Sequence, residues 1–336
     1  MALSFDVLAS TLRILRDREV DNTFRTIPLL DAVKAKGNIE KVNGGSKVNH
    51  PVILAEHSSI TQLSTGYESV NLAVKDPLRT AEFDWCDFVA PVVVTEKEQL
   101  TNKGDRAVIR IAEARLKSVM GMLQREWCKQ VVAGTSTVLT ELNTLNGETK
   151  NTGFFNKAAF GAQNANTVGG IVKADFLQSW QNQVADVAGN FSANGLSKMS
   201  KLMIDTQTYA PEGEVDIILA SPLSYELYRS ALTAQERYSS MEQMRGLSGK
   251  LGLLYNGAMM YIEPNLGFAI GGGDKMSMYF LNSKLFNVYF DQDAFFEMGE
   301  MKAISGYAAM SSNIMTRTQL AISHLAGQGV LINAEA

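Results

Sequence analysis

A single amphipathic segment, from near Asn102 to Gly134, sets the length scale of this protein. Its apolar residues recur every three or four positions, which places them on one face of an α-helix; they are Ile109, Ala112, Leu116, Val119, Leu123, Trp127 and Val131. A helix of about 30 residues is roughly 45 Å long, whereas globular helices average about 11–12 residues. The segment therefore predicts an elongated, plate-like domain with this helix as its spine.

The charge of this predicted helix differs from that of the whole chain. The segment carries seven basic and three acidic residues, a net charge of +4, whereas the chain has a net charge of −4. Arg106, Arg110 and Lys117 are the candidate residues of a basic face. Such a face can meet a polyanion or an acidic neighbouring subunit, and a merely solvated face fits the pattern equally well. The chain as a whole is not a basic nucleic-acid-binding protein.

The stretch from Ile39 to about Val94 has little helical periodicity and favours strands. Residues 47–54 follow a turn-like Gly44-Gly45-Ser46 and alternate in polarity, while residues 58–83 are mostly polar. A two-stranded hairpin with so few apolar residues needs a partner surface. A long surface loop is the alternative interpretation, but loops of this length are uncommon in compact domains unless they are functional. We therefore expect an extended hairpin that packs on another surface.

The remaining patterns predict a mixture of helices and strands in one interlocked unit, so the fold class is α+β. The sequence has no internal repeat and no flexible linker. Helices are expected over 4–19, 29–37, 172–188 and from Pro222 onward, where proline suits a first helical turn. Strands are expected at 201–205, 216–222, 255–265 and 276–290, with a turn at 271–274.

Patterns that carry catalysis or bind cofactors are not found in the sequence. The three histidines, His50, His57 and His324, have no metal-ligand spacing, and Cys86 and Cys128 form no CxxC pair. The sequence also lacks a phosphate-binding GxxxxGK[ST] loop and a GxSxG nucleophile elbow. We therefore predict a protein that is not an enzyme, has no cofactor or metal, and keeps both cysteines as buried thiols.

The sequence also argues against a membrane partner. No apolar run approaches the ~20 residues that span a bilayer, and the charged N-terminal residues do not form a signal peptide. Synthesis in the cytoplasm is therefore expected.

Four segments, in order and spacing, resemble the major capsid proteins of tailed bacteriophages, which have the Hong Kong 97-like fold. The first two are NTFRTIPLLDAVKAKGNIEKVNGGSKVNHPVI (22–53) and the stretch from TGYESVNLAV to RIAEARL (65–116). The others are DIILASPLSYELYRSALTAQERYSS (216–240) and the pair LLYNGAMMYIEPN and MSMYFLNSKLFNV (253–288). Two departures occur: Met259 replaces a proline that is usual in the family, and the tail from Ser311 to Gly329 matches loosely.

This resemblance implies a division of the chain. It implies an N-terminal arm at 1–42, an E-loop with flanking strands at 43–95 and a P-domain at 96–150 with a spine helix at 102–133. An A-domain at 151–285 and C-terminal strands at 286–336 that return to the P-domain would follow. The E-loop would reach over a neighbouring subunit, and the candidate contact residues are Lys47, His57, Tyr67, Lys75 and Arg79.

The function implied by the resemblance is that of a structural shell protein. The chain would self-assemble into hexamers and pentamers of an icosahedral phage head in the bacterial cytoplasm. The head would enclose double-stranded DNA, held by non-specific electrostatics, and a scaffolding protein, a portal and a decoration protein would be its partners. The alternatives are an encapsulin-like nanocompartment shell, an enzyme with an undetected site, and a phage tail or decoration protein.

Overall fold

The computed structural model describes most of the chain, with the backbone alone at 105–113 and at a few further positions. The described residues are 28–54, 62, 64, 66, 69, 77–97, 105–133, 139–143, 153–156, 158–163, 167–210, 212–233, 244–245, 251–264, 266 and 277–335. The helix expected at 4–19 and the turn expected at 271–274 lie outside these residues.

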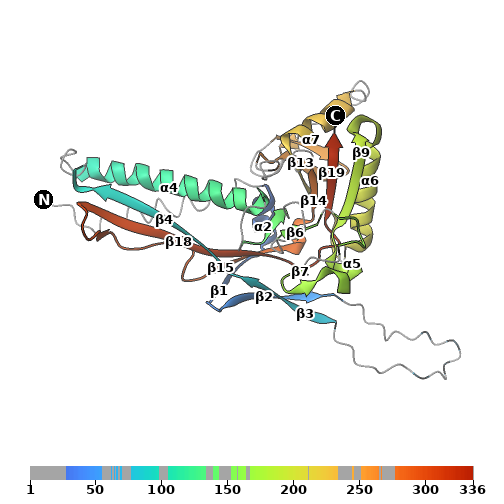
Figure 1. Ribbon diagram of the computed structural model, residues 1–336, viewed down its shortest axis with the longest axis horizontal. Helices are drawn as coiled ribbons and strands as arrows, with labels where there is room; N and C mark the ends of the chain where they lie inside the picture. Colours follow the sequence, from blue (N-terminus) through green and yellow to red (C-terminus); the bar gives the residue numbers. More distant parts are fainter. Residues whose placement is uncertain are drawn as a thin grey trace.

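The subunit is L-shaped, and each limb is built on one β-sheet (Figure 1). The long limb holds a six-stranded sheet and helix α4, Asp105–Ala133. The short limb holds a seven-stranded sheet together with α6, Phe191–Tyr209, and α7, Pro222–Thr233. The α+β class expected from the sequence is confirmed.

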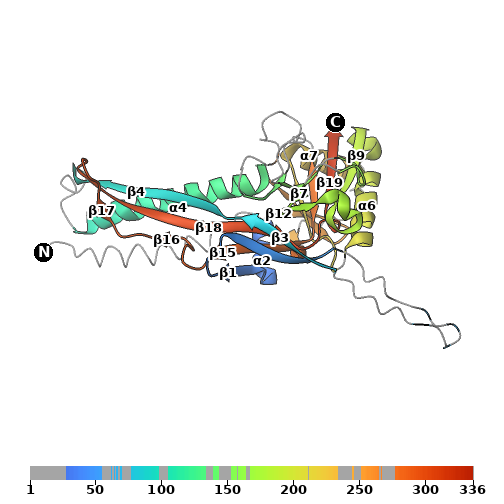
Figure 2. The ribbon, with the colours of Figure 1, turned by 60° about the horizontal axis from the view of Figure 1, so that its bottom comes forward.

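The sheet of the long limb is organised around one long strand, β18 (Ala309–Ile322). Residues 309–318 of β18 pair with β4, and residues 318–322 pair with β15, both antiparallel. Figure 2 shows β4 and β18 running side by side along the limb, with α4 beside them. The other strands of this sheet are β1 (Ile39–Val42), β4 (Cys86–Thr95), β15 (Phe286–Asp291), β16 (Glu297–Met298) and β17 (Lys302–Ala303).

Helix α4 confirms the long spine that the periodicity predicted. It has 29 residues, and Leu116, Leu123, Trp127 and Val131 of the predicted apolar face are buried. The Trp127 ring meets Phe290 of β15 edge to face, with the ring centroids 5.9 Å apart. The helix is therefore held by one apolar stripe along the sheet, which is the arrangement that its three- and four-residue spacing favours.

The short limb has a sheet in the order β11-β12-β13-β10-β14-β19-β9. All four residues of β10 are buried: Ile218 and Ala220 belong to the apolar cluster with α6 and α7, while Ile217 and Leu219 belong to the larger core. The expected buried strand and the helix beginning at Pro222 are both confirmed. The strands are β9 (Gln183–Asn190), β10 (Ile217–Ala220), β11 (Met244–Arg245), β12 (Leu251–Tyr255), β13 (Ala258–Ile262), β14 (Met278–Leu281) and β19 (Gly329–Glu335).

Short elements fill the space between the limbs. Helix α2, Pro28–Lys36, ends at Gly37, whose φ of 80° is the left-handed conformation that a helix stop favours. The others are β2 (Lys47–Ile53), β3 (Leu78–Asp84), β5 (Glu141–Asn143), β6 (Gly153–Phe155), β7 (Thr167–Val168), β8 (Ile171–Val172), η1 (Lys173–Asp175), α5 (Leu177–Trp180) and η3 (Ser283–Leu285).

The helix predicted over 172–188 is wrong. A 3₁₀ turn and the short α5 occupy 173–180, and residues 183–190 form β9, which pairs in parallel with β19. The strand predicted at 201–205 is also wrong, because these residues lie within α6. Asn190 caps α6 by accepting a hydrogen bond from the Ser192 N–H at 2.9 Å. The helix therefore begins at Phe191, just beyond the range predicted from the sequence.

The single strand predicted at 276–290 is divided in the structure. Strand β14 belongs to the short limb, β15 belongs to the long limb, and η3 separates them. Strand β18 lies in the long limb, whereas β19 lies between β14 and β9 of the short limb.

Candidate functional site

The antiparallel pair β2–β3 is the described part of the hairpin that the sequence singled out. Its register runs from Lys47 opposite Asp84 to Ile53 opposite Leu78. Strand β2 alternates strictly between exposed and buried residues, with Val48, His50 and Val52 buried. One face of the hairpin therefore packs on the subunit, and the other face is open.

His50 links the buried face of the hairpin to two chain segments, strand β15 and the residues that follow β18. Its Nδ1 lies 2.8 Å from the Tyr289 hydroxyl of β15, and its Nε2 lies 2.9 Å from the Ser323 Oγ that follows β18. Burial lowers the pKa of His50, because it disfavours the charged imidazolium. A neutral ring suits this position, since it can donate from one nitrogen and accept at the other.

The distal end of β2 and the back of β3 are fixed by two further contacts. The Ser179 hydroxyl of α5 donates to the Leu54 carbonyl at 2.7 Å, and the Glu82 N–H of β3 donates to the Gly169 carbonyl at 2.9 Å. Gly169 has a φ of +58°, and a Cβ there would lie 2.7 Å from the Ala81 Cβ. Only glycine therefore allows the β7–β8 turn to approach β3 this closely.

The open face of the hairpin changes from polar to apolar along its length. Lys47 forms an ion pair with Glu82 at 3.0 Å, and the hydrogen bond to Glu82 raises the pKa of Lys47. At the other end, Ile53 and Leu78 face each other across the strands and are 65% and 56% exposed. Two large, exposed apolar side chains at paired positions of neighbouring strands form a candidate contact surface.

The predicted contact residues are only partly placed by the structure. Lys47 and Arg79 are exposed on β2 and β3, but they lie toward opposite ends of the hairpin. His57, Tyr67 and Lys75 lie outside the described residues. The Ile53–Leu78 pair was not among the residues predicted from the sequence, although Ile53 is an apolar residue at a polar position of the alternation and is therefore expected on the exposed face.

A second exposed apolar surface lies on the long limb, on strand β4. Val89 and Val93 of β4 point away from the buried Val92 and Val94 and are exposed, with Pro91 between them. On the same face, Arg317 of β18 binds Asp87 through two nitrogens, at 2.6 and 3.2 Å. Strand β4 therefore offers an apolar stripe that ends in an ion pair.

The structure describes only some of the side chains on the predicted basic face of the spine helix. Lys117 is exposed, while Arg106 and Arg110 lie within α4 but their side chains lie outside the described residues. Arg115, another basic residue of the helix, donates to the Val93 carbonyl of β4. At least one basic side chain of α4 therefore binds the helix to the sheet of its own limb.

Buried ionisable groups and metal ligands bear on whether the chain has a catalytic centre. Among the described residues, no group of three His, Cys, Asp or Glu side chains could hold a metal ion. Lys173 is fully buried and donates to the Phe154 carbonyl at 2.7 Å, and burial lowers its pKa to about 7. With the Asn182 Oδ1 as its second acceptor at 3.3 Å, Lys173 links η1 to β6 and to the residue before β9.

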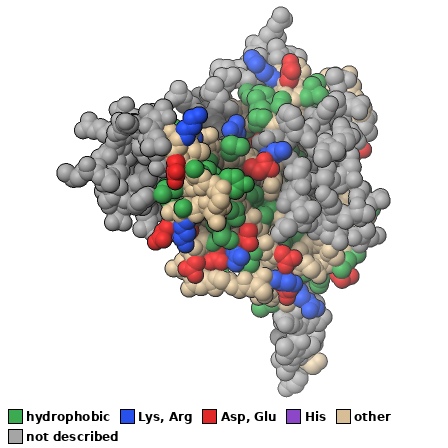
Figure 3. Space-filling model, turned by 60° about the vertical axis from the view of Figure 1, so that its left-hand side comes forward, with side chains coloured by type: hydrophobic (Ala, Val, Ile, Leu, Met, Phe, Trp, Pro, Cys, Tyr) green, Lys and Arg blue, Asp and Glu red, His purple; other side chains and the backbone are tan. Residues whose placement is uncertain are grey.

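The structure also bears on the predictions about the two cysteines and about membrane-spanning segments. Cys86 is a buried thiol, as expected, and the side chain of Cys128 lies outside the described residues. In the part of the chain that the structure describes, no helix is long and apolar enough to cross a membrane. On the face shown in Figure 3, acidic and basic side chains are interspersed among hydrophobic ones.

Comparison with known proteins adds a decisive observation. No family model and no curated protein matches the chain. Among solved structures, a chain of the cyanophage A-1(L) capsid has a TM-score of 0.60 at 12% identity, covering 92% of this chain and 93% of that one. The chain has the Hong Kong 97-like fold.

Further structures with this Hong Kong 97-like fold come from two sources. The encapsulin of Synechococcus elongatus has a TM-score of 0.53 at 14% identity, covering 89% of this chain and 85% of that one. A chain from Gordonia phage Cozz also has a TM-score of 0.53, at 11% identity, covering 91% and 87%. The neighbours thus include both a phage capsid and an encapsulin, and at these identities the likeness concerns the fold.

Proposed function

We propose that this chain is the major capsid protein of a tailed bacteriophage. In this proposal it assembles into hexamers and pentamers of an icosahedral head that encloses double-stranded DNA. The observation that carries the proposal is a hairpin with an open apolar pair on an L-shaped subunit whose fold is that of a phage capsid chain. The shell would form in the bacterial cytoplasm and remain as part of the virion.

The hairpin supplies the contact between subunits in this proposal. Ile53 and Leu78 on its open face, and Arg79 beside them on β3, would lie against the neighbouring subunit, while His50 and Ser179 hold β2 to its own subunit. A patch at one end of the subunit that meets a different patch on the next copy makes a heterologous contact, and such contacts close into rings. His57, Tyr67 and Lys75 remain candidates for the same contact.

The limbs take the roles that the fold suggests. We assign the long limb with α4 to the P-domain, the short limb to the A-domain at the ring centre, and residues 43–95 to the E-loop with its flanking strands. The N-terminal arm would comprise residues 1–42. Strand β19 is placed with the A-domain because it pairs with β14 and β9.

The packaged DNA would be held without sequence reading. Lys117 is exposed on α4, and Arg106 and Arg110 belong to the same helix. Basic side chains on one face neutralise phosphates and release counterions, a contribution that weakens as salt rises. A scaffolding protein, a portal and a decoration protein are the further partners in this proposal.

An encapsulin-like shell is the second candidate, and the likeness to the Synechococcus elongatus encapsulin favours it. Such a shell has the same fold but different contents. Particles purified from the native source that contain double-stranded DNA support the phage head. Particles that contain a protein cargo and no DNA support the encapsulin-like alternative instead.

Electron microscopy of the purified chain, alone and with a co-expressed candidate scaffold, tests shell formation directly. Closed shells or rings of five and six are expected. A variant without residues 55–75 should stay soluble but form no shells, because it lacks the candidate contact residues His57, Tyr67 and Lys75. A uniform monomer under all conditions, or normal shells from the deletion variant, would contradict the proposal.

A further inference from the structure

The two sheets are joined by two short crossings that lie side by side. One leads from β14 to β15 through Asn282–Leu285, and the other leads from β18 to β19 through Ser323–Gln328. Strands β15 and β18 pair antiparallel in the long limb, and β14 and β19 pair antiparallel in the short limb. The four strands therefore form one ribbon, which bends at the crossings, where the Ser323 N–H donates to the Leu285 carbonyl at 2.9 Å.

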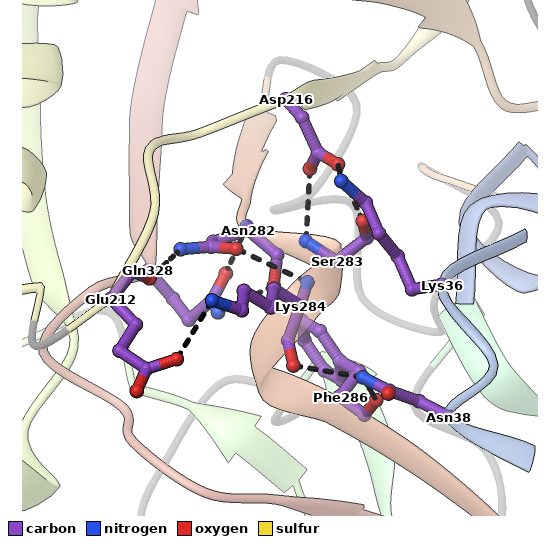
Figure 4. A network of polar contacts seen from close by, with 9 residues as sticks. All are labelled: Lys36, Asn38, Glu212, Asp216, Asn282, Ser283, Lys284, Phe286 and Gln328. Carbon is purple, nitrogen blue, oxygen red and sulfur yellow. Dashed lines mark hydrogen bonds and ion pairs between the residues drawn. The ribbon is translucent and has the colours of Figure 1, made fainter.

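At the bend, the side chain of Gln328 takes the place of a strand. Its Oε1 accepts from the Asn282 N–H at 2.8 Å, and its Nε2 donates to the Asn282 carbonyl at 3.1 Å (Figure 4). Both residues are buried. The side-chain amide thus pairs with both the N–H and the carbonyl of one residue, as a neighbouring strand does, and no buried backbone group of Asn282 is left without a partner.

The same bend is fixed by residues that precede β10. The Asn282 Nδ2 donates to the Glu212 carbonyl at 2.9 Å, and its Oδ1 accepts from the Lys284 N–H at 3.1 Å. The Asp216 carboxylate accepts from the Ser283 N–H at 2.9 Å. These bonds close the 3₁₀ turn and attach it to the short limb (Figure 4).

A third segment, between α2 and β1, holds the far side of the crossing. Asn38 Nδ2 donates to the carbonyls of Lys284 and Phe286, at 2.8 and 3.1 Å. Gly327 in the second crossing serves close packing, since a Cβ there would lie 3.0 Å from the Leu285 Cδ1. The first crossing, Asn282-Ser283-Lys284-Leu285, contains no glycine.

We propose that this junction is a rigid coupling that fixes the angle between the two limbs. A hinge needs a few residues that can change their backbone angles freely, whereas here each crossing is bonded to the other and to two further segments. The inference concerns the single chain and holds whether or not the chain forms a phage head.

Distance measurement by pulsed electron paramagnetic resonance tests this inference on the full chain. Spin labels are attached at Lys201→Cys on α6 and Asn313→Cys on β18, both exposed positions, with Cys86 and Cys128 replaced by alanine. The labelled chain is diluted with unlabelled chain so that only distances within one subunit contribute. A single narrow distance distribution is expected.

The variant Gln328→Met keeps the side-chain length and removes both bonds to Asn282, so its distance distribution should broaden at least twofold. The matched control is Gln130→Met on α4, which removes only a hydrogen bond to Glu126 and should leave the distribution narrow. A broad or two-peaked distribution in the parent chain would overturn the proposal, as would an unchanged distribution in a folded Gln328→Met chain. If Gln328→Met does not fold, Asn38→Ala provides the same comparison.

Discussion

His50 and His324 are both buried near the meeting point of the two limbs. His50 lies in β2 and is bonded to Tyr289 and Ser323, and His324 follows Ser323 in the crossing to β19. Burial lowers the pKa of His50, and it lowers the pKa of His324 to about 4. The Nδ1 of His324 has no hydrogen-bond partner among the described residues. Both rings are therefore held neutral in the folded chain.

This makes the subunit sensitive to acid. An unfolded histidine has a pKa of about 6.5 and binds a proton more readily than these buried rings do, so protonation favours unfolding as pH falls from about 6.5 to about 4. The shift of His324 corresponds to a loss on the order of 3 kcal/mol across that window. Urea unfolding of the unassembled chain at several pH values measures the loss.

The control for this prediction is His324→Phe, which removes the titrating group from the crossing. The free energy of unfolding of this variant should fall less steeply between pH 6.5 and 4 than that of the parent chain. Equal slopes for the two chains would mean that His324 does not contribute to the acid sensitivity.

At the scale of elements, the β7–β8 turn is what holds β3 against the subunit. Gly169→Ala should be destabilising for two reasons: its φ of +58° disfavours a side chain, and the new Cβ would lie 2.7 Å from the Ala81 Cβ. We expect a loss of about 2–3 kcal/mol in the free energy of unfolding. Faster hydrogen exchange at the Glu82 N–H, which donates to Gly169, should accompany it.

The neighbouring glycine separates the two causes. Gly170 has a φ of +75°, but nothing lies within 4 Å of a Cβ built there. Gly170→Ala should therefore cost about 1 kcal/mol from backbone strain alone and leave the Glu82 N–H protected. Equal losses for both variants would show that the close approach to Ala81 does not matter.

At the scale of the whole molecule, assembly should depend on the open end of the hairpin. The double variant Ile53→Lys, Leu78→Glu replaces the exposed apolar pair with opposite charges that can still face each other across the strands. Its free energy of unfolding should change by no more than about 0.5 kcal/mol, because both positions are exposed. Shell formation, followed by sedimentation and electron microscopy, should fall at least tenfold.

Ile204→Asp on α6 is the comparison for this variant. Ile204 is 58% exposed and is as apolar as Ile53, but it lies on a helix of the short limb. Shells should still form from this variant. Loss of shells in both variants would mean that assembly responds to any added surface charge, and normal shells from the hairpin variant would exclude the Ile53–Leu78 pair from the contact.

The sequence by itself determined the elements whose pattern is local. The spacing of Leu116, Leu123, Trp127 and Val131 predicts α4, because a 3.6-residue period places them on one face regardless of what they pack against. The alternation of residues 47–53 likewise predicts β2, and the apolar run at 217–220 predicts a strand buried on both faces. For the candidate site, Lys47 was named through the family resemblance and is exposed on β2, while its role in a contact stays a prediction.

Tertiary structure decided the elements that depend on partners distant in sequence. Residues 183–190 become a strand because β19 pairs with them from more than 140 residues away, and the local pattern alone also suits a helix. The strand predicted over 276–290 is interrupted after Leu281. At Asn282, the side chain of Gln328 makes the two backbone hydrogen bonds that a neighbouring strand would otherwise make. Nothing in the local sequence reveals such a partner, so the bend between the limbs became visible only in the folded chain. The exposed position of Ile53 follows from the alternation of β2, whereas its pairing with Leu78 depends on the register of the two strands.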